Sequence, residues 1–125
     1  MKKINKKILI VEDDPNFISI LKKKFDQEGF TTLTAQDGKE GLNMALREEI
    51  DLVISDVLLP LLIGVEMVKK IKEKKEDLPV VLLTNVKDND YADITKNLKK
   101  VDYLIKSDVR IDEILKIVKK KLGIK

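Results

Sequence analysis

The sequence predicts an α/β fold in which a parallel β-sheet is covered by helices. Five short apolar runs alternate with five segments of helical period, an alternation typical of parallel strands joined by crossover helices. The composition agrees, since 43% of the residues are hydrophobic but only 4% are aromatic, and a core of Ile, Leu and Val suits strands buried on both faces. A chain of 125 residues has the size of one domain.

The five predicted strands differ in polarity, and this orders them within the sheet. The first, third and fourth runs are continuously apolar, which is expected of central strands. The second contains three threonines, and the fifth contains Asp102 and Tyr103, so both tolerate a solvated side and belong at the edges. Right-handed crossovers then favour the order 2-1-3-4-5, a flavodoxin-like (βα)5 sandwich with helices on both faces. The runs are residues 8–11, 30–35, 52–54, 80–83 and 101–105.

Local signals mark where helices start and which faces they bury. Asp14 followed by Pro15 predicts an N-cap and a proline in the first helical position. Asp37 and Glu40 resemble a capping arrangement for the second helix. The last helix has an apolar stripe at spacings of three and four residues, and the first has a shorter one. The stripes are Ile111, Ile114, Leu115, Val118 and Leu122 in the last helix, and Phe17, Leu21 and Phe25 in the first.

The composition excludes several kinds of chemistry. The chain has no cysteine and no histidine, so disulfides, thiolate sites and the commonest transition-metal ligand and general base are absent. The 25 basic and 22 acidic residues leave a charge of only +3, with lysines scattered along the chain, so direct nucleic-acid binding is not indicated. The basic start is followed by a short apolar run that fits neither a signal peptide nor a membrane span. We therefore expect a cytoplasmic protein that acts through carboxylates, Lys, Thr, Ser or Tyr.

Polar residues follow four of the five predicted strands at the carboxyl side. They are Glu12 and Asp13 after the first strand, Asp56 after the third, Thr84 after the fourth and Lys106 after the fifth. The carboxyl ends of parallel strands lie along one edge of a sheet, where open α/β sheets bind ligands. We therefore expect these side chains to converge. Asp51 precedes the third strand and is expected about 15 Å away.

Three carboxylates at one place repel each other unless a cation or a proton relieves them. With oxygen ligands and no His or Cys, a hard ion is favoured, Mg²⁺ or alternatively Mn²⁺. Lys106 adds a positive charge and Thr84 adds a hydroxyl. An Asp nucleophile, a cation, a lysine and a hydroxyl are the parts needed for phosphoryl transfer. Each residue alone has an ordinary structural explanation, such as a helix cap, a strand end or a surface lysine; the combination favours a site.

Four segments contain the residues of the predicted site: residues 7–15 (KILIVEDDP), 51–60 (DLVISDVLLP), 79–84 (PVVLLT) and 102–106 (DYLIK). They resemble the receiver family of two-component response regulators, and the resemblance covers essentially the whole chain. It implies one receiver domain over residues 1–125. We expect no output domain within these residues, whether the receiver stands alone or belongs to a longer protein. It also implies a phospho-accepting switch that assists only its own phosphorylation and dephosphorylation, rather than an enzyme.

The resemblance assigns roles to the residues of the predicted site. Asp56 would accept a phosphoryl group from a histidine kinase or a phosphotransfer protein. Asp13 and Asp56 would bind Mg²⁺ directly, Leu58 would contribute its backbone carbonyl, and Glu12 would act through a water molecule. The absence of histidine in this chain agrees with a donor histidine on another protein.

The resemblance also implies a conformational switch. Lys106 would contact the phosphoryl group, Thr84 would turn its hydroxyl toward it, and Tyr103 would move inward into the vacated space. The surface of the fourth helix, fifth strand and fifth helix would change and contact an unidentified downstream protein or a second copy of the chain. Contact with nucleic acid or a membrane is not expected.

Several residues depart from the family pattern. Leu61, Leu62 and Ile63 form an apolar loop before Gly64, either as a partner contact or as extra core. Ser107 replaces the usual proline after the lysine, so we expect a trans peptide bond there or a strained one, because a cis bond without proline costs about 3 kcal/mol.

Three further departures concern access to Asp56. Asn85 stands where a small residue is common, which would narrow access to the site. Leu58 and Val86 lie two residues beyond Asp56 and Thr84, and neither can orient a water molecule by a hydrogen bond. This predicts slow self-dephosphorylation.

Three alternatives remain open on the sequence alone. A flavodoxin-like cofactor binder shares the topology, but Glu12, Asp13 and Asp14 would repel a phosphate at the first loop. A hydrolase of the haloacid-dehalogenase type would need an Asp two residues after its nucleophile, and Leu58 occupies that position. A receiver-like interaction module that is never phosphorylated is the third.

Overall fold

The computed structural model describes residues 3–85 and 96–124, and its sheet has the predicted topology. Five parallel strands lie in the order β2-β1-β3-β4-β5, which confirms the flavodoxin-like prediction. The helical segment predicted between the fourth and fifth strands falls mainly outside the described residues. The strands are β1 (Lys7–Val11), β2 (Thr31–Ala35), β3 (Leu52–Asp56), β4 (Val80–Thr84) and β5 (Val101–Ile105); the helices are α1 (Pro15–Gln27), α2 (Gly38–Arg47), α3 (Gly64–Lys74) and α5 (Ile111–Lys121).

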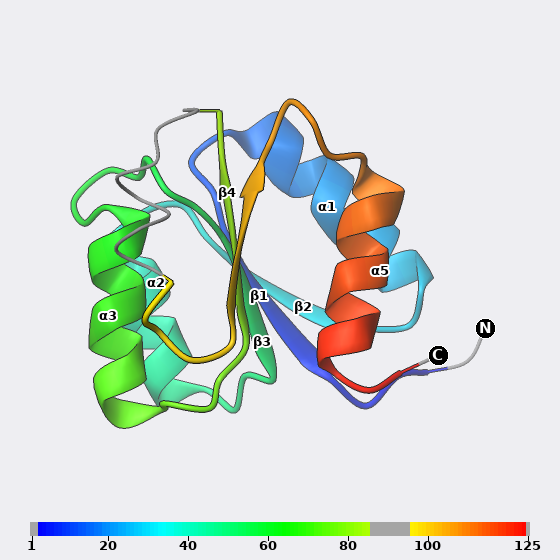
Figure 1. Cartoon of the computed structure of the whole chain (residues 1–125). Coiled ribbons are helices and arrows are strands. Elements are labelled where there is room, and N and C mark those ends of the chain that lie inside the picture. Colours follow the sequence, from blue (N-terminus) through cyan, green and yellow to red (C-terminus); the bar gives the residue numbers. More distant parts are fainter. Residues whose placement is uncertain (1–2, 86–95, 125) are drawn as a thin grey trace.

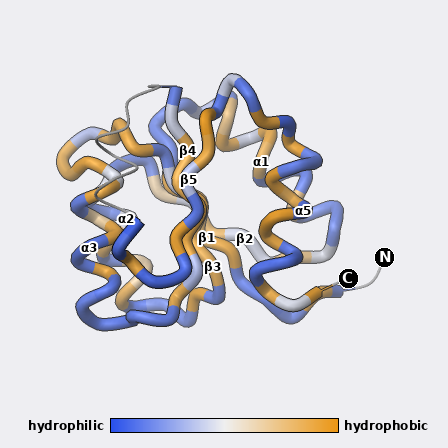
Figure 2. The backbone as a smooth tube through the Cα atoms, in the orientation of Figure 1, coloured by the Kyte–Doolittle hydropathy of each residue, from blue (hydrophilic) through white to orange (hydrophobic). Residues whose placement is uncertain are grey.

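The helices form two layers, with α1 and α5 on one face of the sheet and α2 and α3 on the other (Figure 1). Each layer buries its own cluster of apolar side chains against the strands. The apolar residues concentrate on the strands and on the inner sides of the helices (Figure 2). No helix within the described ranges has the length and apolar character needed to cross a membrane.

The degree of strand burial follows the predicted order. The described residues of β4 are all buried, and β1 and β3 are buried except at one end. The edge strands β2 and β5 are mostly half-buried. The mixed polarity of the second and fifth runs therefore indicated the edge positions correctly, because an edge strand keeps one side accessible to solvent.

The helix starts also match their sequence signals. The Asp14 side chain accepts a hydrogen bond from the backbone N–H of Asn16 at 3.0 Å, and Pro15 begins α1. The Asp37 side chain accepts one from the backbone N–H of Glu40 at 2.7 Å and caps α2. The stripe in α5 buries Ile114, Leu115 and Val118.

The loop between β3 and α3 is held by close backbone packing. A Cβ atom at Gly64 would clash with the backbone carbonyl of Asp56, so only glycine fits there. The backbone N–H of Gly38 donates to the carbonyl of Pro60 at 3.1 Å, which attaches the loop to the start of α2. The peptide bond that precedes Ser107 is trans, one of the two outcomes expected for a serine at this position.

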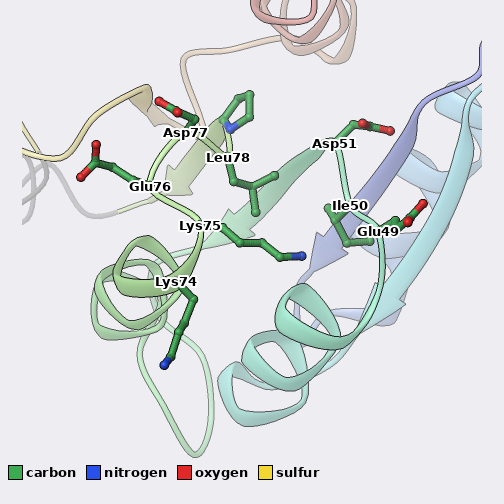
Figure 3. Close-up of a pocket in the computed structure, with 9 residues that line it drawn as sticks. Glu49, Ile50, Asp51, Lys74, Lys75, Glu76, Asp77 and Leu78 are labelled. Carbon is green, nitrogen blue, oxygen red and sulfur yellow. The ribbon is translucent and has the colours of Figure 1, made fainter.

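An open hollow of about 660 Å³ lies at the amino-terminal edge of the sheet (Figure 3). Lys75 reaches across it, and its Nζ donates to the carbonyls of Ala45 and Glu48 at 2.6 and 3.0 Å. These carbonyls lie at the end of α2, so the lysine caps that helix. Asp51 lies at the same edge and accepts a hydrogen bond from the backbone N–H of Lys7 at 2.8 Å. As expected, it is away from the carboxyl ends of the strands.

Candidate functional site

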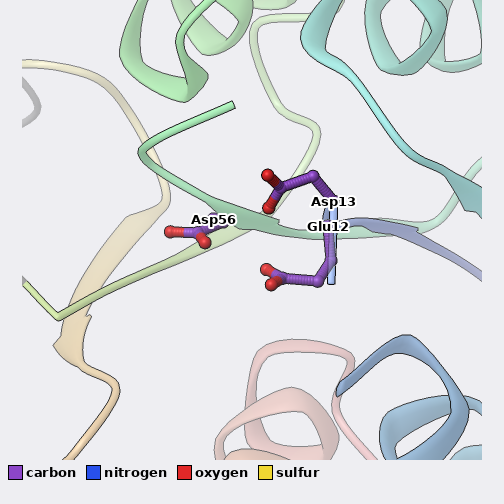
Figure 4. Close-up of side chains that lie close together, drawn as sticks. All are labelled: Glu12, Asp13 and Asp56. Carbon is purple, nitrogen blue, oxygen red and sulfur yellow. The ribbon is translucent and has the colours of Figure 1, made fainter. Parts of the chain in front are cut away.

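Three carboxylates gather where β1 and β3 end side by side. The two strands pair through Val11 and Ser55, so the next residues along each strand meet at the carboxyl edge. One oxygen from each of Glu12, Asp13 and Asp56 lies within 4.8 Å of the others. The side chains of Glu12 and Asp13 extend toward the side on which Asp56 lies (Figure 4). The structure therefore brings together the three acidic residues that the sequence placed at this edge.

The donor set fits a hard divalent cation. All three side chains offer only carboxylate oxygens, and the chain has no His or Cys to attract a softer metal. Glu12 is buried, Asp56 is half-buried and Asp13 is exposed, so the cluster is open to solvent on the Asp13 side. Close carboxylates on this scale need positive charge nearby. A cation such as Mg²⁺ would supply it.

Lys106 supplies positive charge at the same edge of the sheet, from the end of β5. Its Nζ lies 2.9 Å from Oε1 of Glu12 and 3.6 Å from Oδ2 of Asp56. The Lys106 side chain is only 14% exposed, so its charge is poorly screened by water. Its backbone N–H donates to the carbonyl of Thr84 at 2.6 Å, which fixes where the side chain starts. The lysine and the acidic cluster thus form one site.

Burial raises the pKa of Glu12 to about 7 from its ordinary value of 4.5. The hydrogen bond from Lys106 opposes this rise, and the negative charge of Asp56 adds to it. A bound cation would oppose this rise, because it favours the ionised form of Glu12.

The other predicted residues differ in how deeply they are buried. Thr84 is fully buried at the end of β4. Tyr103 is half-buried on β5 and packs against the cluster beneath α2 and α3. The backbone N–H of Leu58 donates to Oδ1 of Asp56 at 3.4 Å, while its side chain is 49% exposed. Val86 lies outside the described residues.

The apolar loop after Asp56 is divided between the core and the surface. Leu62 packs against the core. Leu61 and Ile63 remain 76% and 38% exposed, and Leu61 has φ +68°, a left-handed conformation that is unusual for leucine. The loop therefore displays two large apolar side chains near the site.

Sequence reasoning missed one contact in this site. It placed Phe17 only on the apolar stripe of the first helix, but the ring centroid of Phe17 lies 4.0 Å from Nζ of Lys106. Phe17 comes three residues after the N-cap Asp14 and so occupies the first turn of α1. That position, beside the end of the first strand, was the available signal.

Fold and site together define a doubly wound α/β protein with a carboxylate and lysine site at the switch point of its strand order. The sequence pattern described as "Response regulator receiver domain" matches residues 8–119, so the chain belongs to the receiver domain family of two-component response regulators.

Two relatives by sequence illustrate the family. Sporulation initiation phosphotransferase F of Bacillus subtilis is 34% identical over 122 residues, which are 98% of this chain and 98% of that protein. The alkaline phosphatase synthesis transcriptional regulatory protein PhoP of the same species is 38% identical over 88 residues. That match covers 70% of this chain but only 36% of PhoP, so the chain corresponds to part of the larger regulator.

Two solved structures are similar over nearly their whole length. A CheY-like response regulator receiver domain protein from Methanospirillum hungatei has a TM-score of 0.88 at 26% identity, with 94% of both chains covered. The response regulator TrrA from Thermotoga maritima, in complex with Mg(2+)-BeF, has a TM-score of 0.82 at 32% identity. The match to TrrA covers 94% of this chain and 99% of that chain.

Proposed function

We propose that this chain is a signalling switch in which Asp56 accepts a phosphoryl group from a histidine kinase or a histidine phosphotransfer protein. The observation that carries the proposal is the position of the Lys106 ammonium, 3.6 Å from the Asp56 carboxylate and 2.9 Å from Glu12. An acceptor carboxylate beside a poorly solvated cation is suited to a reaction that brings negative oxygens to it. Membership of the receiver family supports the same function.

The acidic cluster would hold Mg²⁺, or Mn²⁺ in its place. Asp13 and Asp56 would bind it directly, the backbone carbonyl of Leu58 would provide a further ligand, and Glu12 would act through water. The cation would neutralise charge on the phosphoryl oxygens. Glu12 and Lys106 would stay paired and so keep the charge of the site balanced.

The transfer itself uses the side chains of this protein. An oxygen of Asp56 attacks the phosphorus of the donor phosphohistidine; the P–O bond forms as the N–P bond breaks, and the leaving imidazole takes a proton from solvent. Lys106 then contacts an oxygen of the new acyl phosphate. Thr84 turns its hydroxyl toward another, and Tyr103 moves inward.

This movement would change the surface formed by β5, α5 and the helix expected between β4 and β5. The partner would be an unidentified downstream protein or a second copy of the chain, contacted directly and without nucleic acid or membrane. On this proposal residues 1–125 are one receiver domain in the cytoplasm, and the chain assists only its own phosphorylation and dephosphorylation.

Intact mass spectrometry after incubation with a small acyl phosphate and Mg²⁺ tests the proposal. We expect the parent protein to gain one phosphate, and Asp56→Asn or excess chelator to abolish the gain. Asp51→Asn is the matched control because Asp51 lies at the opposite edge of the sheet; this variant should label like the parent. Absence of labelling in the parent, or labelling of Asp56→Asn, would contradict the proposal and favour an interaction module that is never phosphorylated.

A further inference from the structure

The Lys106 ammonium has an aromatic neighbour as well as two acidic ones. Its Nζ lies 4.0 Å from the ring centroid of Phe17, in addition to its contacts with Glu12 and Asp56. A cation over an aromatic face within about 6 Å is attracted by the negative charge of that face, and the attraction grows as water is removed. The Lys106 side chain is only 14% exposed, so we expect this attraction to be strong.

The position of the ring is fixed by elements unrelated to the lysine. Asp14 caps α1 and Pro15 begins it, so Phe17 sits in the first turn. The start of α1 lies at the edge of the sheet where β5 ends (Figure 1). The half-buried ring also packs against the apolar cluster beneath α1 and α5. A ring held by the helix cap and by the core provides a rigid surface for a flexible side chain.

A fixed lysine matters for the proposed reaction. Lysine has a flexible four-carbon stem and a strongly hydrated charge, and holding it in one place costs rotamer entropy. Glu12 lies closer to the ammonium than Asp56 does, 2.9 against 3.6 Å, and so attracts it away from the acceptor. An aromatic face attracts the ammonium without adding a further negative charge to the site. Preorganised charge of this kind lowers the barrier to transfer.

We propose that Phe17 is a positioning residue for phosphoryl transfer, an inference that rests on the proposed phosphorylation of Asp56. Its ring holds the Lys106 ammonium beside Asp56 by a cation–π interaction and keeps water from it. Phe17 does not touch the reacting atoms and acts only through the lysine.

The test is a graded series at position 17. Phenylalanines with increasing ring fluorination keep nearly the same shape but progressively weaken the negative charge of the ring face. Phe17→Tyr keeps the aromatic face, and Phe17→Leu keeps only an apolar side chain. The initial rate of Asp56 phosphorylation by a small acyl phosphate with Mg²⁺ is followed by intact mass. A small donor is used so that the docking of a protein partner does not contribute.

We expect the rate to fall steadily with fluorination, to fall about three- to tenfold in Phe17→Leu, and to be retained in Phe17→Tyr. The same series in a Lys106→Met background should be flat, because the ring then has no cation to hold. If Phe17 had only a structural role, the rate would not depend on the charge of the ring face. Circular dichroism confirms that each variant is folded.

The outcomes separate the two proposals. If the parent is not labelled, the proposed function itself fails. If the parent is labelled but the rate is insensitive to fluorination, or equally sensitive with and without the Lys106 side chain, the positioning role is overturned and Phe17 serves only the core.

Discussion

Glu12 is the buried carboxylate of the acidic cluster, and its ionisation opposes folding when no cation is bound. Its pKa of about 7 in the folded protein exceeds its ordinary value of 4.5, so the folded state binds this proton more tightly than the unfolded chain does. Between these two values the unfolding free energy therefore falls as the pH rises. The contribution of a neutral Glu12 is present below about pH 4.5 and is lost above about pH 7.

We expect Glu12→Gln to remove this loss. In the presence of chelator, its stability relative to the parent should be greater near pH 8 than near pH 5, because glutamine stays neutral throughout. Urea unfolding of both proteins at the two pH values measures the difference. An identical pH dependence in the parent and the variant would mean that Glu12 is ionised in the folded protein throughout this range.

The Leu58 side chain lies beside the proposed phosphorylation site and cannot orient water. It is half exposed, and its backbone N–H already donates to Asp56. We expect Leu58→Asn to speed loss of the phosphoryl group about two- to tenfold, the effect of one added hydrogen bond to the attacking water. The decay of the labelled protein by intact mass, after removal of the donor, gives this rate. A lifetime equal to that of the parent would contradict the explanation.

Leu61 adopts a backbone conformation that suits glycine better than leucine. Its φ of +68° is strained for a residue with a Cβ, and its side chain is mostly exposed, so little burial is lost on removing it. We expect Leu61→Gly to raise the unfolding free energy by about 0.5 kcal/mol, the relief of strain less the entropy cost of glycine. Ile63→Gly is the control, since Ile63 has φ −65°, and it should lose stability. Chemical denaturation measures both.

At the scale of the elements, much of the architecture could be predicted because it depends on local patterns. Continuous apolar runs identified β1, β3 and β4, and Asp14 and Asp37 identified two helix starts. Contacts between distant segments could not be predicted in this way. The periodicity of a helix shows which face is buried but not which polar group a long side chain will reach. Phe17 against Lys106 and Lys75 against the end of α2 are of this second kind.

The same limit applies to the acidic and lysine residues of the site. The strand ends predicted that Asp56 and Lys106 share an edge, since this follows from parallel topology alone. They did not predict that Lys106 would lie closer to Glu12 than to Asp56, because strand topology does not fix the conformation of a long side chain.

Lys75 links two helices that are separate in sequence. Its ammonium donates to the carbonyls of Ala45 and Glu48. At the end of a helix such carbonyls have no backbone N–H within the helix to donate to them. We expect Lys75→Met to lower the unfolding free energy by about 1–2 kcal/mol and to speed amide hydrogen exchange in the last turn of α2. Lys74→Met removes the same charge from an exposed neighbour and should have little effect. Equal losses in the two variants would make the effect one of net charge.

At the scale of the whole molecule, the acidic cluster exists only in the folded chain. Glu12 and Asp13 follow β1, whereas Asp56 ends β3, and the parallel sheet is what brings their oxygens within 4.8 Å. An unfolded chain offers these carboxylates one at a time. A cation held by the cluster should therefore bind the folded state and stabilise it by mass action.

We expect Mg²⁺ to raise the unfolding temperature of the parent, with a stabilisation of about 2.7 kcal/mol when its concentration is a hundred times the dissociation constant. Asp13→Asn should differ from the parent both without and with Mg²⁺. Without Mg²⁺ it should be more stable than the parent, because one of three repelling charges is gone; with Mg²⁺ it should gain little, because a ligand is gone. Asp51→Asn keeps the cluster intact and should respond like the parent. Scanning calorimetry across a magnesium titration distinguishes these outcomes, and an equal response of Asp13→Asn and the parent would place the cation elsewhere in the protein.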